Sequence, residues 1–263
     1  MLLGAADAHL PPLRLLHQRL YDRQFARVVP WARRFRGVYA TFEEAVRAAP
    51  ATKPVGYNNP GAAKFMQPSR ELSISDYPVL FWLQKCLQES PSLLDIGGYV
   101  GISYYSYKRY LDYPDNLEWV IQDVPAVIGD GAEIARNQQS HGLSFVAEVT
   151  PALRAQTVLA DGSLQFIKES FTDLLMRMGS LPKHLIVSKM PLTDLPDFIT
   201  LQDLGPAVCP YKIFNRARFI ESVEALGYRL VDSWENIELD CRIPFYPEQT
   251  VRTYSGLYFQ ASK

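Results

Sequence analysis

Short apolar runs alternate with stretches of helical period from about residue 90 onward. Such runs are typical of strands covered on both faces, because those strands need not alternate apolar and polar positions. They predict five successive strands at residues 93–96, 117–123, 144–148, 157–161 and 184–188. Helices are expected between them, and runs at 228–231 and 257–260 add a closing pair that contains an antiparallel strand. The pattern predicts an α/β fold: a Rossmann-like, doubly wound, mostly parallel sheet of seven strands.

The first segment predicts a basic helix, in which arginines fall largely between apolar residues at near-helical spacing. The apolar positions are Leu13, Leu16, Leu20, Phe25 and Val28, and the basic ones are Arg14, Arg19, Arg23 and Arg27. Two interpretations stay open. The arginine face is either solvated, on a helix that caps the domain or forms a homodimer, or it contacts an anionic lipid, a partner or an acidic substrate.

Three further segments precede the first strand. The sequence predicts a turn at 36–39, a short helix at 41–45 and a loop at 50–60. A longer helix follows, with Ser75 or Asp76 as its N-cap, and ends before the first strand. We therefore expect an N-terminal helical extension over residues 1–72, on the acceptor side, and a second domain over 73–263.

Composition narrows the function classes. The 263 residues are 48% hydrophobic, which is enough for a substantial core, and the net charge of −1 gives no general reason to expect a nucleic-acid partner. The three cysteines, Cys86, Cys209 and Cys241, lack metal-ligand spacing and are interpreted as reduced thiols. No signal peptide or apolar run of transmembrane length is evident, so we expect a cytoplasmic protein without an integral membrane segment.

A glycine-rich turn directly follows the first predicted strand. Glycines there let the backbone approach a ligand closely, and the helix that follows presents free N–H groups. Gly98 and Gly101 match the last two glycines of the dinucleotide fingerprint, but Ile96 stands in place of the first. A nicotinamide cofactor is therefore disfavoured, although an NAD(P)-dependent oxidoreductase remains one alternative.

The turn is instead similar to motif I of class I S-adenosylmethionine-dependent methyltransferases, acidic-x-Gly-x-x-x-Gly, through Asp95, Gly97 and Gly101. The resemblance implies that the turn, with Gly98 and Tyr99, carries the methionine half of S-adenosylmethionine. The acidic residue would then meet the cofactor's ammonium group. Tyr99 stands where many of these enzymes have their second glycine. It therefore also supports an alternative reading as a catalytically silent binding or assembly protein with this fold.

A second acidic residue ends the second predicted strand. Asp123 lies where a ribose-binding carboxylate is expected, and Asp123-Val124-Pro125 is similar to the Asp-Leu-Pro string of many small-molecule O-methyltransferases. Val124 and Glu148, which ends the third predicted strand, complete the expected cofactor residues.

Five pieces spread over most of the chain resemble one little-described group of bacterial methyltransferases with a Gly-Gly motif I. They are Arg36-Gly37-Val38-Tyr39, Tyr77-Pro78-Val79-Leu80, Asp95-Ile96-Gly97-Gly98 with Trp119–Asp123, Leu164-Gln165-Phe166, and the string around Gln202. This chain departs from the group at Asp161, Lys189 and Cys209. The departures lie on the acceptor side, so the resemblance leaves the substrate open.

Methyl transfer needs mainly in-line alignment of the acceptor with the methyl group. None of the four histidines follows the fifth predicted strand, so we expect no histidine base there. Asp161, which ends the fourth predicted strand, is the candidate base or acceptor-orienting residue. The acceptor, a small molecule or a saccharide, is expected near Tyr57 and against the loop 237–252, with Phe245 and Tyr246 as a pocket wall.

Overall fold

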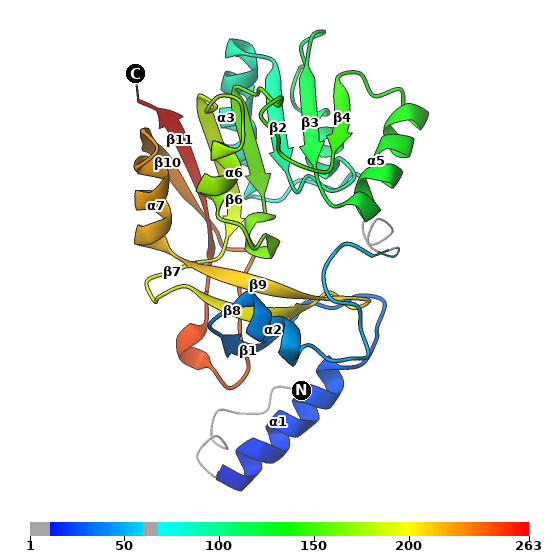
Figure 1. The fold of residues 1–263 in the computed structure, drawn as a ribbon, viewed down its shortest axis with the longest axis vertical. Coiled ribbons are helices and arrows are strands. Elements are labelled where there is room, and N and C mark those ends of the chain that lie inside the picture. Colours follow the sequence, from blue (N-terminus) through cyan, green and yellow to red (C-terminus); the bar gives the residue numbers. More distant parts are fainter. Residues whose placement is uncertain (1–10, 60, 62–67, 263) are drawn as a thin grey trace.

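The computed structural model describes residues 11–59, 61 and 68–262 and contains a large and a small sheet (Figure 1). The large sheet has the strand order β10-β11-β6-β5-β2-β3-β4. Its strands are β2 Ser92–Ile96, β3 Glu118–Gln122, β4 Leu143–Val146, β5 Thr157–Asp161, β6 His184–Met190, β10 Tyr228–Asn236 and β11 Tyr254–Ala261. Strands β2 to β6 pair in parallel, whereas β11 runs antiparallel to both β6 and β10. This sheet confirms the predicted fold class.

Helices cover both faces of the large sheet because its strands are apolar on both sides. Leu93 packs in one hydrophobic cluster and Leu94 in another, as side chains on opposite faces of β2 must. The covering helices are α3 Asp76–Glu89, α4 Ile102–Tyr107, α5 Pro125–Asn137, α6 Phe171–Met176 and α7 Arg216–Glu224. The cluster around Leu94 contains α6 and α7 residues, and the cluster around Leu93 contains α3 and α4 residues.

The small sheet has the strand order β1-β8-β9-β7 and was not predicted. Its strands are β1 Arg34–Tyr39, β7 Leu192–Thr193, β8 Phe198–Asp203 and β9 Val208–Asn215. The prediction of a turn at 36–39 is therefore wrong. Gly37, with a φ of 72°, lies where the register between β1 and β8 shifts, and this irregularity hid the strand. Because β1 pairs with β8, the segment before residue 72 joins a sheet made mostly of residues 192–215.

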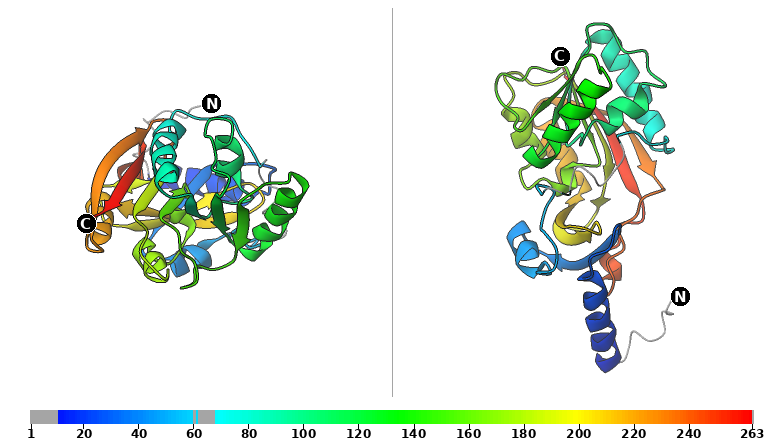
Figure 2. Two further views of the ribbon diagram at one scale, coloured as in Figure 1. Left: turned by 90° about the horizontal axis from the view of Figure 1, so that it is seen from above. Right: turned by 90° about the vertical axis from the view of Figure 1, so that its right-hand side faces the viewer.

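The N-terminal segment contains helix α1 (Pro11–Phe25) and helix α2 (Phe42–Ala48), which begins after its N-cap Thr41. Figure 2 shows α1 projecting from the rest of the molecule. Phe25 at its end is buried, whereas Leu15, Leu16 and Leu20 are exposed. The homodimer through this helix stays a prediction. No helix in the described ranges is both long and apolar enough to cross a membrane.

Candidate functional site

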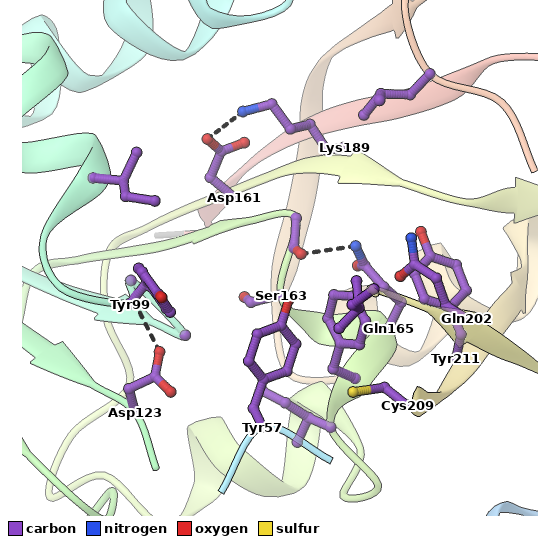
Figure 3. Close-up of a pocket in the computed structure, with 18 of the residues that line it drawn as sticks. Tyr57, Tyr99, Asp123, Asp161, Ser163, Gln165, Lys189, Gln202, Cys209 and Tyr211 are labelled. Carbon is purple, nitrogen blue, oxygen red and sulfur yellow. Dashed lines mark hydrogen bonds and ion pairs between the residues drawn. The ribbon is translucent and has the colours of Figure 1, made fainter. Parts of the chain in front are cut away.

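A pocket of about 670 Å³ lies between the carboxyl edge of the large sheet and the small sheet. We call its two parts the glycine-loop half and the small-sheet half. The glycine-loop half is lined by Asp95, Gly97, Gly98, Tyr99, Ile102, Ser103, Gln122, Asp123 and Val124. The small-sheet half is lined by Trp31, Arg33, Gln165, Phe166, Ile167, Gln202, Leu204, Cys209, Pro210, Tyr211, Asn236, Glu238, Leu239 and Tyr254. Figure 3 shows Asp123 and Tyr99 on one side, Gln202 and Tyr211 on the other, and Tyr57 between them.

The pocket opens where the strand order reverses. The chain runs outward from β2 through β3 to β4, and then returns to place β5 on the other side of β2. The loops after β2 and β5 therefore leave the sheet in opposite directions, and a crevice forms between them. Residues of both loops line the pocket, which is the position where open α/β sheets bind ligands.

Neighbouring side chains leave no room for a Cβ atom at the glycines after β2. Gly97 has a φ of 67°, and a Cβ there would lie 2.4 Å from the Cβ of Ser163. A Cβ on Gly98 would lie 2.6 Å from the Asp95 carboxyl carbon. Tyr99 has a φ of 57°, in the left-handed region that favours glycine. A strained non-glycine residue in a ligand-facing loop is often part of a functional site.

Asp95 is 1% exposed at the end of β2. Its Oδ2 accepts a hydrogen bond of 3.2 Å from the Trp119 indole nitrogen. Burial disfavours the charged carboxylate and raises the pKa of Asp95 to about 8, although the indole bond acts in the opposite direction. The group is therefore largely protonated at neutral pH in this structure, and a nearby cation would favour its ionisation.

Asp123 follows β3 and is held by the backbone. Its Oδ2 accepts the Tyr99 N–H at 2.8 Å, and its Oδ1 accepts the Val124 N–H at 2.7 Å. Burial raises the pKa of Asp123, while these two hydrogen bonds lower it. Each oxygen keeps acceptor capacity for a ligand hydroxyl, because a carboxylate oxygen has two lone pairs.

A cluster of ion pairs lies at the end of β5 and joins residues of β5, β6 and α3. Lys189 Nζ lies 2.5 Å from Asp161 Oδ2 and 3.1 Å from Asp76 Oδ1. Arg70 makes two hydrogen bonds to the Asp76 carboxylate, of 2.6 and 2.7 Å, and its Nη2 lies 3.7 Å from Asp161 Oδ2. Burial acts to raise the pKa of Asp76, but Arg70 and Lys189 lower it overall. The Tyr107 hydroxyl donates to Asp76 Oδ1 at 3.1 Å.

The ion pairs of this cluster hold the side chain of Asp161, the predicted base or acceptor-orienting residue. It lines the pocket, with Oδ2 bound to Lys189. Its Oδ1 is buried and has no hydrogen-bond partner among the described residues. Lys189, at the end of β6, has a φ of 54°, a second strained non-glycine conformation at the pocket. Of the two predicted N-caps of α3, Ser75 is confirmed: the helix begins at Asp76 after Ser75, which makes no side-chain capping bond.

Tyr57 crosses the pocket from a separate segment. The residues before it pair with the start of β9 through Gly56 N–H to Val208 O, and Asn58 Oδ1 accepts the Ala126 N–H of α5. The Tyr57 ring contacts Phe166 edge to face at 5.3 Å. The expected placement of Tyr57 beside the acceptor is thus compatible with its position between the two halves of the pocket (Figure 3).

Other predicted residues lie elsewhere. Glu148 is exposed after β4 and is not among the residues lining the pocket, and Gly101 is the N-cap of α4, where a Cβ would lie 2.9 Å from the Tyr105 ring. The prediction of Phe245 and Tyr246 as a wall of this pocket is wrong. They line a second, smaller cavity of about 270 Å³ beside α1. The loop 237–252 meets the main pocket through Glu238 and Leu239 instead.

Several contacts and roles of the pocket residues were not predicted from the sequence. Arg70 and Lys189 join Asp76 across up to 113 residues of chain, so no local pattern reveals their ion pairs. Tyr211 and Tyr254 meet through a hydroxyl–hydroxyl bond of 2.8 Å between the two sheets. Gln202 was named only as part of a family string, and no local pattern showed that it lines the pocket.

The sequence matches no protein-family profile and no curated protein. Similar solved structures include the Burkholderia thailandensis 1,6-didemethyltoxoflavin-N1-methyltransferase, with its acceptor and S-adenosylhomocysteine bound. It is 17% identical with a TM-score of 0.48, over 72% of this chain and 79% of that one. Magnesium protoporphyrin IX methyltransferase from Synechocystis PCC 6803, with bound S-adenosylmethionine, is 16% identical with a TM-score of 0.45, over 70% and 77%. The CcbJ methyltransferase from Streptomyces caelestis is 11% identical with a TM-score of 0.48, over 73% and 97%.

Proposed function

We propose that this protein transfers the methyl group of S-adenosylmethionine to an oxygen or nitrogen of a small-molecule or saccharide acceptor. The observation that carries the proposal is the meeting of Asp95, the Gly97-Gly98 turn and Asp123 in one pocket at the switch point of the sheet. A buried carboxyl group beside the turn suits the cofactor's ammonium, and an acceptor at the end of β3 suits a ribose diol.

The residues of the glycine-loop half fit this cofactor. Asp123 offers both oxygens to the pocket while the Tyr99 and Val124 N–H groups fix its orientation. Asp95 gains a cation partner and gives up its proton when the ammonium is present. The cofactor itself supplies an electrophilic methyl group, so the protein needs mainly to align the acceptor and exclude water.

Asp161 is proposed to orient the acceptor. Lys189 and Arg70 hold its Oδ2, which fixes the carboxylate, and its Oδ1 is left to accept a hydrogen bond from the group to be methylated. Cys209 is not proposed as a nucleophile, because burial raises the pKa of its thiol to about 12.

A catalytically silent binding protein is the second candidate, and the strained Tyr99 in the cofactor turn is the observation that favours it. Calorimetric titration with S-adenosylhomocysteine, S-adenosylmethionine and NAD separates the candidates. Binding of the first two but not NAD is expected from a methyltransferase. Failure to bind either sulfur compound would favour the silent protein, and binding of NAD alone would favour an oxidoreductase.

The matched variant for this titration is Asp123→Ala. It removes charge-assisted hydrogen bonds of about 1.5–3 kcal/mol and should weaken S-adenosylhomocysteine binding roughly ten- to more than a hundredfold. Glu148→Ala serves as the control, because Glu148 is exposed outside the pocket, and it should leave the affinity unchanged. Equal affinities of the parent and Asp123→Ala would remove Asp123 from the cofactor site.

A further inference from the structure

The small-sheet half of the pocket contains two buried amide oxygens that have no hydrogen-bond partner within the described part of the chain. Gln165 is 4% exposed and Gln202 is 6% exposed. The Gln165 Nε2 donates to Gly162 O at 2.8 Å, which leaves its Oε1 as the atom without a hydrogen bond. The Oε1 of Gln202 is likewise unpaired among the described residues. Buried polar atoms are nearly always hydrogen-bonded, so two orphans in one pocket indicate a ligand that supplies donors.

The charged residues of the pocket lining restrict the net charge of that ligand. Of the described residues that line this half, those with a formal charge at neutral pH are Arg33 and Glu238. The cations Arg70 and Lys189 line the same pocket outside this half, and both are already paired with the carboxylates of Asp76 and Asp161. Arg33 already donates to Asp240 through both its carboxylate and its backbone oxygen, and it lies over the rings of Phe35 and Tyr254. Glu238 is exposed. A phosphate or carboxylate in this half would therefore find no uncommitted cation among these residues, so the pocket favours a neutral molecule.

The walls around the two glutamines are mostly aromatic and apolar. The ring centroid of Phe166 lies 5.3 Å from that of Tyr57 and 5.1 Å from that of Tyr211, and both pairs pack edge to face. Pro210 and Leu239 add further apolar surface. A pyranose ring matches this combination, because its C–H groups pack on apolar surface while its hydroxyl groups donate at the ring edge.

We infer that the acceptor bound in the small-sheet half is an uncharged, polyhydroxylated ring of the saccharide class, with hydroxyl groups that donate to Gln165 Oε1 and Gln202 Oε1. The inference rests on the proposed function, because it places the hydroxyl to be methylated between these glutamines and the glycine-loop half. The glutamines act as specificity-determining residues. They hold the ring. In the transfer, the acceptor hydroxyl oxygen forms a bond to the methyl carbon as the S–CH3 bond breaks, S-adenosylhomocysteine is the leaving group, and the hydroxyl proton passes to solvent.

The test is saturation-transfer NMR with millimolar probes, with and without S-adenosylhomocysteine. The probes are methyl α-D-glucopyranoside, methyl α-D-galactopyranoside and methyl α-D-mannopyranoside, with catechol, glycerol 3-phosphate and ethanolamine for comparison. Transfer to the ring protons of at least one pyranoside is expected, at several times the level for the comparison probes. No transfer to any pyranoside, or stronger transfer to a comparison probe, would overturn the inference.

Paired substitutions show whether the amide oxygens are responsible. Gln202→Met and Gln165→Met keep the side-chain length but remove the acceptor, and should reduce pyranoside transfer at least fivefold. Gln202→Glu keeps an acceptor and should retain more of the signal than Gln202→Met. Unchanged transfer in both methionine variants would refute the role of the glutamines. S-adenosylhomocysteine affinity is measured on the same samples and should stay within twofold of the parent, so failure of the cofactor proposal is recognised separately.

Discussion

At the scale of single residues, Asp95 is the group whose chemistry depends most on its surroundings. The carboxyl group is almost completely buried at the end of a central strand, and the indole of Trp119 donates a hydrogen bond to it. Uptake of a proton lowers the cost of burying it, which is why its pKa rises to about 8. In the unfolded chain the same carboxyl group titrates near pH 4.

This difference predicts a pH dependence of stability. Between about pH 4 and pH 8 the folded protein holds a proton on Asp95 that the unfolded chain has released. Its contribution is therefore fully present below pH 4 and is lost as the pH rises toward 8. Without cofactor, the free energy of unfolding should fall less steeply from pH 5 to pH 8 in Asp95→Asn than in the parent.

Denaturant titrations of both proteins across this range measure the effect. Asp173→Asn is a suitable control, since Asp173 lies in the first turn of α6, remote from the pocket lining. It should reproduce the slope of the parent at these pH values. Parallel slopes for the parent and Asp95→Asn would show that Asp95 is ionised throughout.

Residue roles were predictable where the chemistry is local. Asp95, Gly97 and Asp123 stand in short motifs at strand ends, and the structure places all three at the pocket. The ion pairs of Lys189 were beyond prediction, because they depend on which strands become neighbours. The assignment of these residues to cofactor binding stays a prediction.

At the scale of elements, the turn after β2 shows how the Asp95 side chain restricts which residue can stand at position 98. The φ of Gly98 is not in the left-handed region, so alanine suits its backbone, but a Cβ would lie 2.6 Å from the Asp95 carboxyl carbon. Gly98→Ala should therefore destabilise the protein by about 1–3 kcal/mol through overpacking alone. The same substitution in an Asp95→Ala background should cost much less, because the obstructing group is gone.

A double-mutant cycle by chemical denaturation measures this coupling. Additive effects of the two substitutions would show that the loop moves aside and that Asp95 does not require glycine at position 98. Gly97 is a poorer probe. A Cβ there meets Ser163, and its positive φ adds strain for any other residue.

The seven strands of the large sheet were predictable, because buried parallel strands are continuous apolar runs separated by helical segments. The small sheet was not. Strand β8 lies between Pro196 and Pro206, and β9 contains Pro210, so these runs lack the usual strand signature. Strand β8 pairs with β1 on one side and with β9 on the other.

At the scale of the whole molecule, a buried ion cluster ties the N-terminal segment to the small sheet. Lys53 and Asp203 have fully buried side chains 2.6 Å apart, and Arg34 of β1 also contacts the Asp203 carboxylate. Three separate parts of the chain therefore meet at one charge. Removing one partner of such a cluster leaves a buried charge with less compensation.

We expect Lys53→Met to lower the free energy of unfolding by about 3 kcal/mol, at the lower end for a broken buried pair because Arg34 remains. Lys212→Met is the matched control. Lys212 lies 3.7 Å from Asp197 in a partly exposed pair on the same sheet, and its loss should cost under about 1 kcal/mol. Equal losses in the two variants, measured by denaturant titration, would contradict a special role for Lys53.

The pairing of Tyr39 with Ile199 also has a consequence for synthesis on the ribosome. These residues are 160 positions apart, so β1 emerges ~10–30 s before its partner at ordinary elongation rates. During that interval its hydrogen-bonding edge is available to other nascent chains. The Arg34 and Arg36 side chains on this strand are charged, and charge on an unpaired edge opposes such association. The small sheet, and with it one wall of the pocket, is therefore completed only after most of the large sheet has been made.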